Sequence, residues 1–271
     1  MNMELSDLSR RPQRLYSAYI FDLDGTVYLG DALLPTAGAT IQRLRGLGKR
    51  TIFLSNNPTK TRAAQADALT RLGLPTPVED VLNSGLVMAR FLQRRMPGAR
   101  LFVIGETPLQ QLLRQAGFEL ADDAAVDAVI VSFDRTFDYH KLQVAFDALR
   151  GGARFFATNG DKYCPTPDGG QPDAAALIAA LEACTDVKVE AIVGKPSAIM
   201  AEAALALLDL PPAECVMTGD RLETDVLMGL DAGMAAALTL TGATSAAQAA
   251  GSSIRATYVI NRLAELLPES S

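Results

Sequence analysis

The sequence predicts an α/β protein in which helices cover parallel β-sheets. Apolar runs of strand length alternate along the chain with longer segments in which apolar residues recur at the helical period, and this alternation is typical of parallel sheets. The chain has 271 residues. Because domains commonly contain about 100 to 200 residues, we expect two of them.

The N-terminal part of the chain contains two expected strands of the same pattern. Residues 18–23 form an apolar run that ends in charged side chains, and residues 50–57 form one that ends in polar side chains. Between them, apolar side chains at helical spacing, Ile41, Leu44 and Leu47, predict a helix that starts near residues 35–36. A glycine at position 48 is expected to end this helix, because glycine favours the conformation that follows a last helical turn.

The rest of the chain continues the alternation. Pro58 and a Thr59 N-cap predict a helix that continues to about residue 72. Further strands are expected at 101–104, 128–132, 154–157, 191–193, 215–218, 236–240 and 258–260. Longer helices are expected at 139–149, 174–183 and 197–208, and the alanine-rich residues 243–250 are expected to form a loop and a short helix.

The composition is that of a globular protein, with 49% apolar and 21% charged residues. The formal net charge of −6 gives no reason to expect nucleic acid or an anionic membrane as a partner, and a metal cation is a more natural one. No segment has the pattern of a signal peptide, and no apolar stretch approaches the roughly 18 residues of a membrane span. We therefore expect a cytoplasmic protein without a membrane partner.

The cysteines do not indicate a zinc site or a disulfide framework. Cys164, Cys184 and Cys215 are an odd number, lie far apart and form no CxxC pair, and the chain has a single histidine, His140. We expect three reduced thiols, as is usual in the cytosol.

Polar side chains follow four of the expected strands at the point where each strand ends. They are Asp22 and Asp24, then Ser55, Asn56 and Asn57, then Lys195, and finally Asp220 with Asp225. In an open parallel sheet, ligands bind at the carboxyl ends of the strands, so we expect these side chains to converge on one crevice. Clustered carboxylates repel one another and are costly to desolvate, and a divalent cation together with a lysine would compensate them. Mg²⁺ suits such an oxygen-only site, and it commonly binds together with phosphate.

These residue types suit phosphoryl chemistry. An aspartate can attack phosphorus and form an aspartyl-phosphate, which divides a hydrolysis into two easier steps. A second carboxyl group two residues further on can protonate the leaving oxygen and then activate water, which typically contributes about 10² to 10⁴ in rate. Ser55 and Asn56 would hold phosphoryl oxygens, and Lys195 would neutralise charge in the transition state. Gly25 would allow a tight backbone turn beside the metal.

The segments DLDGTVY, LSNN, GKP and GDRLETD, in this order, resemble the four motifs of the haloacid dehalogenase-like phosphatase superfamily. The wording DLDGTVYLG, followed by SNN and later by GKP, is similar to the branch that includes nitrophenyl phosphatases, nucleotide phosphatases and pyridoxal-phosphate or phosphoglycolate phosphatases. The resemblance implies a magnesium-dependent phosphatase that acts on a small-molecule phosphate ester. It also implies a Rossmann-like parallel-sheet core at 1–87 and 189–271, with a large α/β cap domain inserted at 88–188.

The resemblance assigns a role to each of the polar strand ends. Asp22 would be the nucleophile and Asp24 the acid/base. The phosphate-binding residues would be Ser55, Asn56, Asn57 and Lys195. The metal ligands would be Asp22, Asp24 through its backbone carbonyl, and Asp220, with Asp225 in a supporting position.

The expected cap contains one segment that suits substrate selection. Residues 158–173 are polar and rich in glycine and proline, follow an expected strand and precede an expected helix. Asp173, which precedes a run of alanines, is expected to cap that helix, with contact to solvent or substrate as alternatives. Relatives often pair through their caps, so the resemblance also implies a homodimer.

Two other function classes are compatible with part of this pattern. A dehalogenase would use the same nucleophile on carbon, but halide departure needs no proton donor such as Asp24. A phosphoryl-receiver or binding protein would also combine acidic residues with a lysine. Receivers normally have about 120 residues, and an insertion of the size of the expected cap has no role in them. No glycine-rich phosphate-binding loop indicates a kinase.

Overall fold

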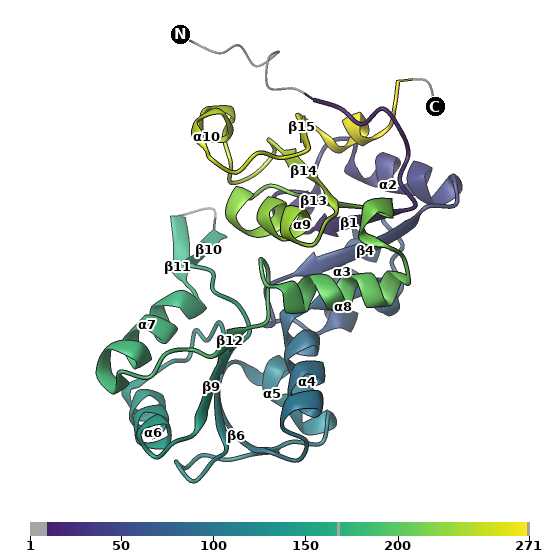
Figure 1. The fold of residues 1–271 in the computed structure, drawn as a ribbon. Helices are drawn as coiled ribbons and strands as arrows, with labels where there is room; N and C mark the ends of the chain where they lie inside the picture. The colour runs from purple at the N-terminus through teal and green to yellow at the C-terminus, as the bar shows by residue number, and fades with distance from the viewer. Residues whose placement is uncertain (1–9, 167–168, 270–271) are drawn as a thin grey trace. The chain divides into compact units, whose positions relative to one another are not determined.

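The computed structural model describes residues 10–166 and 169–269. Within them the chain forms two compact α/β units (Figure 1). The first contains the described parts of Met1–Ser55, Ala63–Leu82 and Ala201–Ser271, and the second those of Asn56–Arg62 and Asn83–Met200. The predicted fold class, an α/β body with parallel strands that carries an inserted α/β body, is confirmed. The cap boundaries at residues 88 and 188 stay a prediction.

A six-stranded sheet forms the centre of the first unit, in the order β15-β14-β13-β1-β4-β5. Its strands are β1 (Ala18–Asp22), β4 (Arg50–Ser55), β5 (Val81–Asn83), β13 (Cys215–Gly219), β14 (Ala235–Thr239) and β15 (Tyr258–Ile260). Strand β1 pairs in parallel with both β13 and β4. The carboxyl ends of these three neighbouring strands therefore lie at the same edge of the sheet.

One face of this sheet packs against α2 (Ala37–Gly46) and α3 (Arg62–Arg71). Ile41 and Leu44 of α2 are fully buried in a core that also contains the rings of Phe21 and Phe53. Burial of one such aliphatic side chain contributes roughly 1.5–3 kcal/mol, so this stripe fixes α2 on the sheet. Leu47, the third apolar residue of the expected helix, follows the last residue of α2 and is only half-buried.

The other face of the sheet has its own small core. Leu222 and Val226 pack there against Ala236 and Leu238 of β14, whereas Ala237 belongs to the core on the α2 side. This alternation follows from the two-residue period of a strand. Further helical elements of the unit are η3, a π-helical turn (Leu222–Val226), α9 (Leu227–Asp231), α10 (Ala246–Gly251), most of α8 (Ala198–Leu208), and the 3-10 turns η1 (Val78–Asp80), η2 (Pro212–Glu214) and η4 (Leu263–Leu266).

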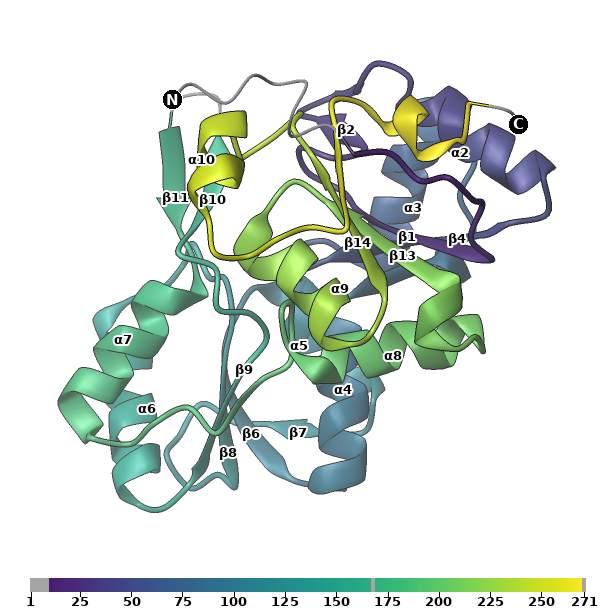
Figure 2. The ribbon, with the colours of Figure 1, turned by 45° about the horizontal axis from the view of Figure 1, so that its top comes forward.

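The second unit has a five-stranded sheet in the order β12-β9-β8-β6-β7. Its strands are β6 (Arg100–Ile104), β7 (Glu119–Leu120), β8 (Ala128–Val131), β9 (Arg154–Ala157) and β12 (Ala191–Ile192), and every neighbouring pair is parallel. Helices α4 (Ser84–Arg95) and α5 (Thr107–Gln115) cover one face, and α6 (Tyr139–Arg150) and α7 (Ala174–Thr185) cover the other (Figures 1 and 2). This unit is therefore a three-layer structure with its own core.

The Thr59 cap predicted from the sequence is wrong. Helix α3 begins at Arg62, and Thr59 lies in the turn before it. The Asn57 side-chain oxygen accepts hydrogen bonds from the backbone N–H of Thr59 at 2.9 Å and from its hydroxyl at 2.7 Å. This Asx-type turn competes with helix formation and delays the first helical turn.

Two short hairpins were not expected. Strand β2 (Tyr28–Leu29) pairs with β3 (Ala32–Leu33) in the first unit, and β10 (Tyr163–Thr166) pairs with β11 (Gly169–Pro172) in the second. The second hairpin lies within the expected substrate loop at 158–173. Two residues of that loop, Pro167 and Asp168, lie outside the described residues.

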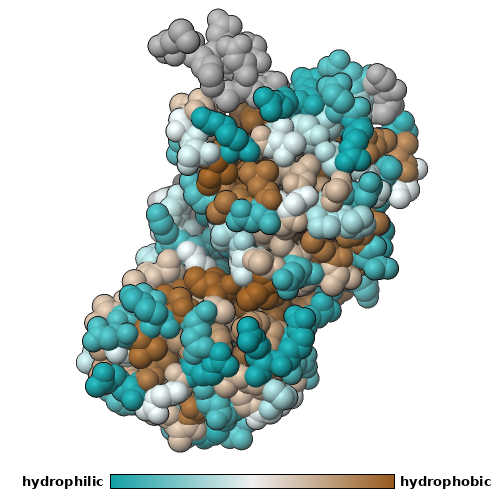
Figure 3. Space-filling model, viewed as in Figure 1, coloured by the Kyte–Doolittle hydropathy of each residue, from teal (hydrophilic) through white to brown (hydrophobic). Residues whose placement is uncertain are grey.

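The surface is mostly hydrophilic on the face seen in Figure 3, with smaller hydrophobic areas between. Among the described residues, the large hydrophobic side chains that are exposed are Leu29, Val78, Tyr139 and Tyr163. Among the described helices, none combines the length and the apolar character that crossing a bilayer requires. Cys164, Cys184 and Cys215 are all free thiols.

Candidate active site

The strand order of the first unit brings three of the predicted site residues to one edge. Asp22 is the last residue of β1, Ser55 is the last residue of β4, and Asp220 directly follows β13. Because β1 lies between the other two strands and is parallel to both, all three residues stand at the same edge of the sheet.

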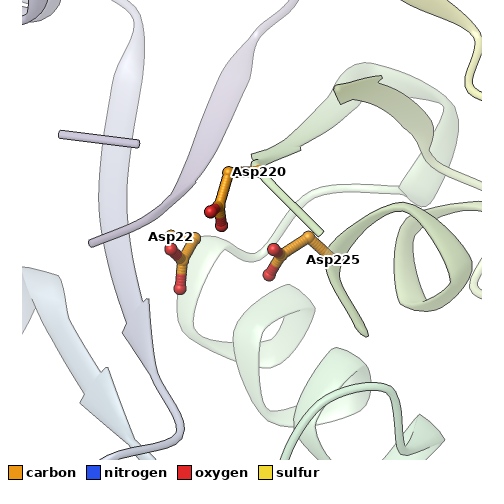
Figure 4. Close-up of side chains that lie close together, drawn as sticks. All are labelled: Asp22, Asp220 and Asp225. Carbon is orange, nitrogen blue, oxygen red and sulfur yellow. The ribbon is translucent and has the colours of Figure 1, made fainter. Parts of the chain in front are cut away.

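Three carboxylates converge at this edge. Asp22, Asp220 and Asp225 each offer one oxygen, and these oxygens lie within 4.8 Å of one another, with the side chains directed toward a common point (Figure 4). Asp220 and Asp225 are 3% and 1% exposed. Carboxylates this close and this buried repel one another unless a cation lies among them. An all-oxygen donor set suits Mg²⁺, so the residues present fit the predicted metal.

Two glycines leave the room that the Asp220 side chain needs. A Cβ atom on Gly25 would lie 2.5 Å from Asp220 Oδ2, and one on Gly242 would overlap the same carboxylate. Gly25 also has a φ of +83°, a backbone conformation that favours glycine. The backbone N–H of Ala243 donates a hydrogen bond to Asp220 Oδ2. Asp220 is thus held from a loop near the C-terminus of the chain.

Asp225 is positioned by a widened helical turn. It lies in η3, and its Oδ2 accepts a hydrogen bond from the backbone N–H of Arg221 at 3.2 Å. A Cβ on Gly219, the last residue of β13, would overlap the Asp225 side chain. A π-helical turn of this kind is frequent at functional sites because it redirects side chains.

Asp24 lies in the loop that follows β1 and is not one of the three clustered carboxylates. Its side chain is exposed, and the Tyr28 hydroxyl donates to Asp24 Oδ2 over a long distance of 3.4 Å. Thr241 Oγ1 donates to the carbonyl oxygen of Gly25 at 2.7 Å and so ties this loop to the residues after β14. An exposed carboxyl group beside a fixed backbone has room for a leaving group or a water molecule.

Sequence reasoning missed the contribution of the loop after β14. Thr241 and Ala243 hold Gly25 and Asp220 by hydrogen bonds, and Gly242 leaves room for the Asp220 carboxylate. Of these three residues only Ala243 lay in a segment with an expectation, a loop and short helix at 243–250. The signal was present, because the strand expected at 236–240 runs directly into threonine and glycine, as the other site strands run into polar residues.

The remaining predicted residues, Asn56, Asn57 and Lys195, belong to the second unit. Asn56 and Lys195 are joined by two hydrogen bonds: the Lys195 backbone N–H donates to Asn56 Oδ1 at 2.8 Å, and Asn56 Nδ2 donates to the Lys195 carbonyl at 3.1 Å. Lys195 is 4% exposed, so it is not a solvated surface lysine. Asn57 shapes the turn described above through its side-chain oxygen.

Asp173 caps helix α7, as expected from the sequence. Its side chain accepts a hydrogen bond from the backbone N–H of Ala174. It also accepts one from Asn159 Nδ2 at 2.9 Å, and both Asp173 and Asn159 are buried. The ends of the expected substrate loop are therefore fixed by polar contacts inside the second unit.

Comparisons with known proteins agree with this geometry. A family model described as haloacid dehalogenase-like hydrolase matches residues 19–119, and a second, described as HAD-hydrolase-like, matches residues 192–266. The first match begins in β1 and includes Asp22, and the second includes Lys195 and Asp220.

Curated proteins and solved structures match over most of the chain. The sugar-phosphatase AraL of Bacillus subtilis is 41% identical over 82% of this chain and 82% of its own length. The 5'-nucleotidase YutF of the same species is 32% identical over 94% of this chain and 99% of its own. The crystal structure of 4-nitrophenylphosphatase from Thermotoga maritima superposes with a TM-score of 0.89 at 32% identity, covering 93% of this chain and 96% of that one.

Proposed function

Because the chain belongs to the haloacid dehalogenase-like hydrolase family, we propose that it is a magnesium-dependent phosphatase that hydrolyses a small-molecule phosphate monoester through an aspartyl-phosphate. The observation that carries the proposal is the convergence of Asp22, Asp220 and Asp225 at the carboxyl edge of the first sheet. Relatives of similar length that are named as phosphatases or as a nucleotidase support the same reaction class.

Two aspartates are proposed to carry the bond changes. A carboxylate oxygen of Asp22 attacks phosphorus, the bond from phosphorus to the ester oxygen breaks, and Asp24 donates its proton to the departing alkoxide. Asp24 then removes a proton from water, the resulting hydroxide attacks the same phosphorus, and inorganic phosphate leaves as the Asp22 carboxylate is restored. The exposure of the Asp24 side chain supports this exchange of alcohol for water.

The metal is proposed to be held by Asp22, by the backbone carbonyl of Asp24 and by Asp220, with Asp225 in support. When bound, Mg²⁺ would offset the mutual repulsion of these carboxylates and the negative charge of the phosphoryl group. Gly25 and Gly242 support this assignment, because a side chain at either position would collide with the Asp220 carboxylate.

The phosphoryl group is proposed to be bound by Ser55, Asn56, Asn57 and Lys195. Ser55 is 4% exposed at the end of β4, on the strand next to Asp22. The side-chain amide of Asn56 already holds the backbone of Lys195, so we propose that Asn56 contacts phosphate through its main chain. The Lys195 ammonium group would offset charge in the transition state.

The remaining expectations form part of the same proposal. We propose that the second unit is the cap, predicted at 88–188, and that its loop at 158–173 selects the leaving group. A cytoplasmic location, a homodimer formed through the cap, and the absence of nucleic acid and membrane partners are proposed from the sequence and from the family resemblance.

The test is release of inorganic phosphate from a panel of sugar phosphates, nucleoside monophosphates and nitrophenyl phosphate, with Mg²⁺ and with EDTA. The parent protein is compared with Asp22→Asn and with Asp67→Asn, a matched change at an exposed position of α3. We expect metal-dependent turnover that Asp22→Asn abolishes and Asp67→Asn leaves unchanged. Turnover that survives in Asp22→Asn would rule out the aspartyl-phosphate, and binding of esters without any turnover would favour a binding protein.

A further inference from the structure

The side chain of Asn56 is fully engaged within the second unit. Its Oδ1 accepts the backbone N–H of Lys195, and its Nδ2 donates to the carbonyl of the same residue. Nδ2 also donates to Asp161 Oδ2 at 2.9 Å. One amide thus holds the main chain of Lys195 on both sides, and Asp161 holds that amide.

The contact between Asn56 and the lysine segment is tight. A Cβ on Gly194 would lie 2.6 Å from Asn56 Oδ1 and 2.6 Å from the carbonyl oxygen of Thr158. The chain at Gly194 therefore passes between Asn56 and Thr158 with no room for a side chain. A small shift of the Asn56 amide would have to move the backbone that carries Lys195.

Asp161 is itself fixed by buried polar groups. Asn159 Nδ2 donates to Asp161 Oδ2 at 3.1 Å and to Asp173 Oδ1 at 2.9 Å, and Asn159 is 1% exposed. The two amides from Asn56 and Asn159 therefore converge on one carboxylate oxygen. Hydrogen bonds to an ionised carboxylate are shorter and stronger than those between neutral groups.

We propose that Asp161 is a positioning residue for Lys195 and acts through Asn56. This inference rests on the proposed function, in which Lys195 binds the phosphoryl group. Asp161 orients the Asn56 amide, the amide fixes both polar groups of the Lys195 main chain, and the ammonium group is thereby held at one place. The first residues of the expected substrate loop, 158–161, thus brace the phosphate-binding lysine.

The first test is a double-mutant cycle in kcat/KM, using Asp161→Ala, Lys195→Met and the double variant. Displacement of a catalytic group by about 1 Å can cost about 100-fold, so we expect Asp161→Ala to lower kcat/KM by about 10- to 100-fold. In the Lys195→Met background the same change should cost less than about twofold, because the residue on which it acts is gone. Losses that multiply in the double variant would overturn the proposal, since a contact with substrate or a general loss of stability gives that result.

A second measurement does not depend on turnover. Equilibrium binding of inorganic phosphate to the Mg²⁺-loaded protein, followed by calorimetry, should be weaker in Asp161→Ala than in the parent protein, and the double variant should bind phosphate no more weakly than Lys195→Met alone. Asp161→Asn keeps one acceptor oxygen and should recover most of the loss; an Asn variant as weak as the Ala variant would contradict the hydrogen-bond argument. Asp122→Ala, at an exposed position of the same unit, is the matched control.

The same experiments separate this proposal from the proposed function. Lys195→Met with the parent kcat/KM would show that the role proposed for Lys195 is wrong, whatever Asp161 does. If Asp161→Ala does not fold, as judged by circular dichroism, the cycle is run with Asp161→Ser, whose shorter side chain withdraws the acceptor oxygen from the Asn56 amide. A parental value of kcat/KM and of phosphate affinity in a folded Asp161→Ala protein would refute the positioning role alone.

Discussion

Replacing Gly242 by alanine should disable the site while leaving the fold intact. The added Cβ would lie 2.6 Å from Asp220 Cγ and 2.8 Å from Asp220 Cβ, whereas ordinary contacts begin at 3.4 Å. The Asp220 carboxylate must therefore retreat by at least about 0.8 Å, and its Oδ2, the atom nearest to the added Cβ, by more, since the loop that carries Gly242 is tied to the site by hydrogen bonds on both of its sides. A displacement of this size costs about 100-fold in rate, so kcat/KM should fall by that factor, equivalent to about 2.7 kcal/mol of transition-state stabilisation.

The assay combines phosphatase kinetics over a range of Mg²⁺ concentrations with a direct metal titration. Mn²⁺ bound to the protein can be followed by electron paramagnetic resonance, and we expect its affinity to fall together with kcat/KM. Gly251→Ala is the control, because a Cβ at that glycine would meet nothing within 4 Å. A Gly242→Ala protein with parental metal affinity and activity would refute the argument, because Asp220 would then either tolerate displacement or take no part in the site.

Three further predictions concern the core and the thiols. Leu44→Ala should lower the free energy of unfolding by about 2–5 kcal/mol in urea titrations, because the Leu44 side chain on α2 is fully buried. Arg43→Gln, at the exposed neighbouring position, should change it by less than about 0.5 kcal/mol. Equal effects of the two changes would contradict the packing of α2. At pH 8 a thiol reagent should modify the exposed Cys184 quickly, whereas burial raises the pKa of Cys215 to about 11 and should leave it unreactive until the protein unfolds. Because the fold disfavours the Cys215 thiolate, stability should fall as the pH rises from about 9 toward 11, and Cys215→Ala should remove that part of the loss; rapid labelling of Cys215 in the native state would contradict its burial.

The strands and the acidic site were largely predictable because both leave local signals in the sequence. The expected strand at 18–23 corresponds to β1, and those at 215–218 and 258–260 correspond to β13 and β15 to within one residue. Asp22 and Asp220 were recognised as candidate site residues because a carboxylate directly after a buried strand is costly to desolvate unless a partner compensates its charge. Their proximity follows from the parallel strands, because the carboxyl ends of neighbouring parallel strands lie at the same edge of the sheet.

The turn before α3 and the contacts of Asn56 could not be predicted from the sequence. They depend on contacts between residues far apart in the chain, or on which of two hydrogen-bonding patterns a few neighbouring residues adopt. Asn57 accepts a hydrogen bond from the backbone N–H of Thr59 and thereby forms a turn where the sequence predicted a helix cap. Asn56 was expected at the phosphate, but its side chain is committed to Lys195, which lies 139 residues further along the chain. No periodicity or composition encodes such a partner.

The pairing of β1 has a consequence for biosynthesis. One neighbour of β1 is β4, which follows it closely in the sequence. The other neighbour is β13, in which Cys215, the partner of Ala18, lies about 200 residues later. At a synthesis rate of about 5–20 residues per second, the ribosome needs roughly 10 to 40 s to reach that partner. The whole of Asn83–Met200 emerges in this interval, so the inserted unit can fold while the strand that ends in Asp22 still has one open edge. The nascent chain therefore cannot assemble its acidic site until β13, Asp220 and Asp225 have been made.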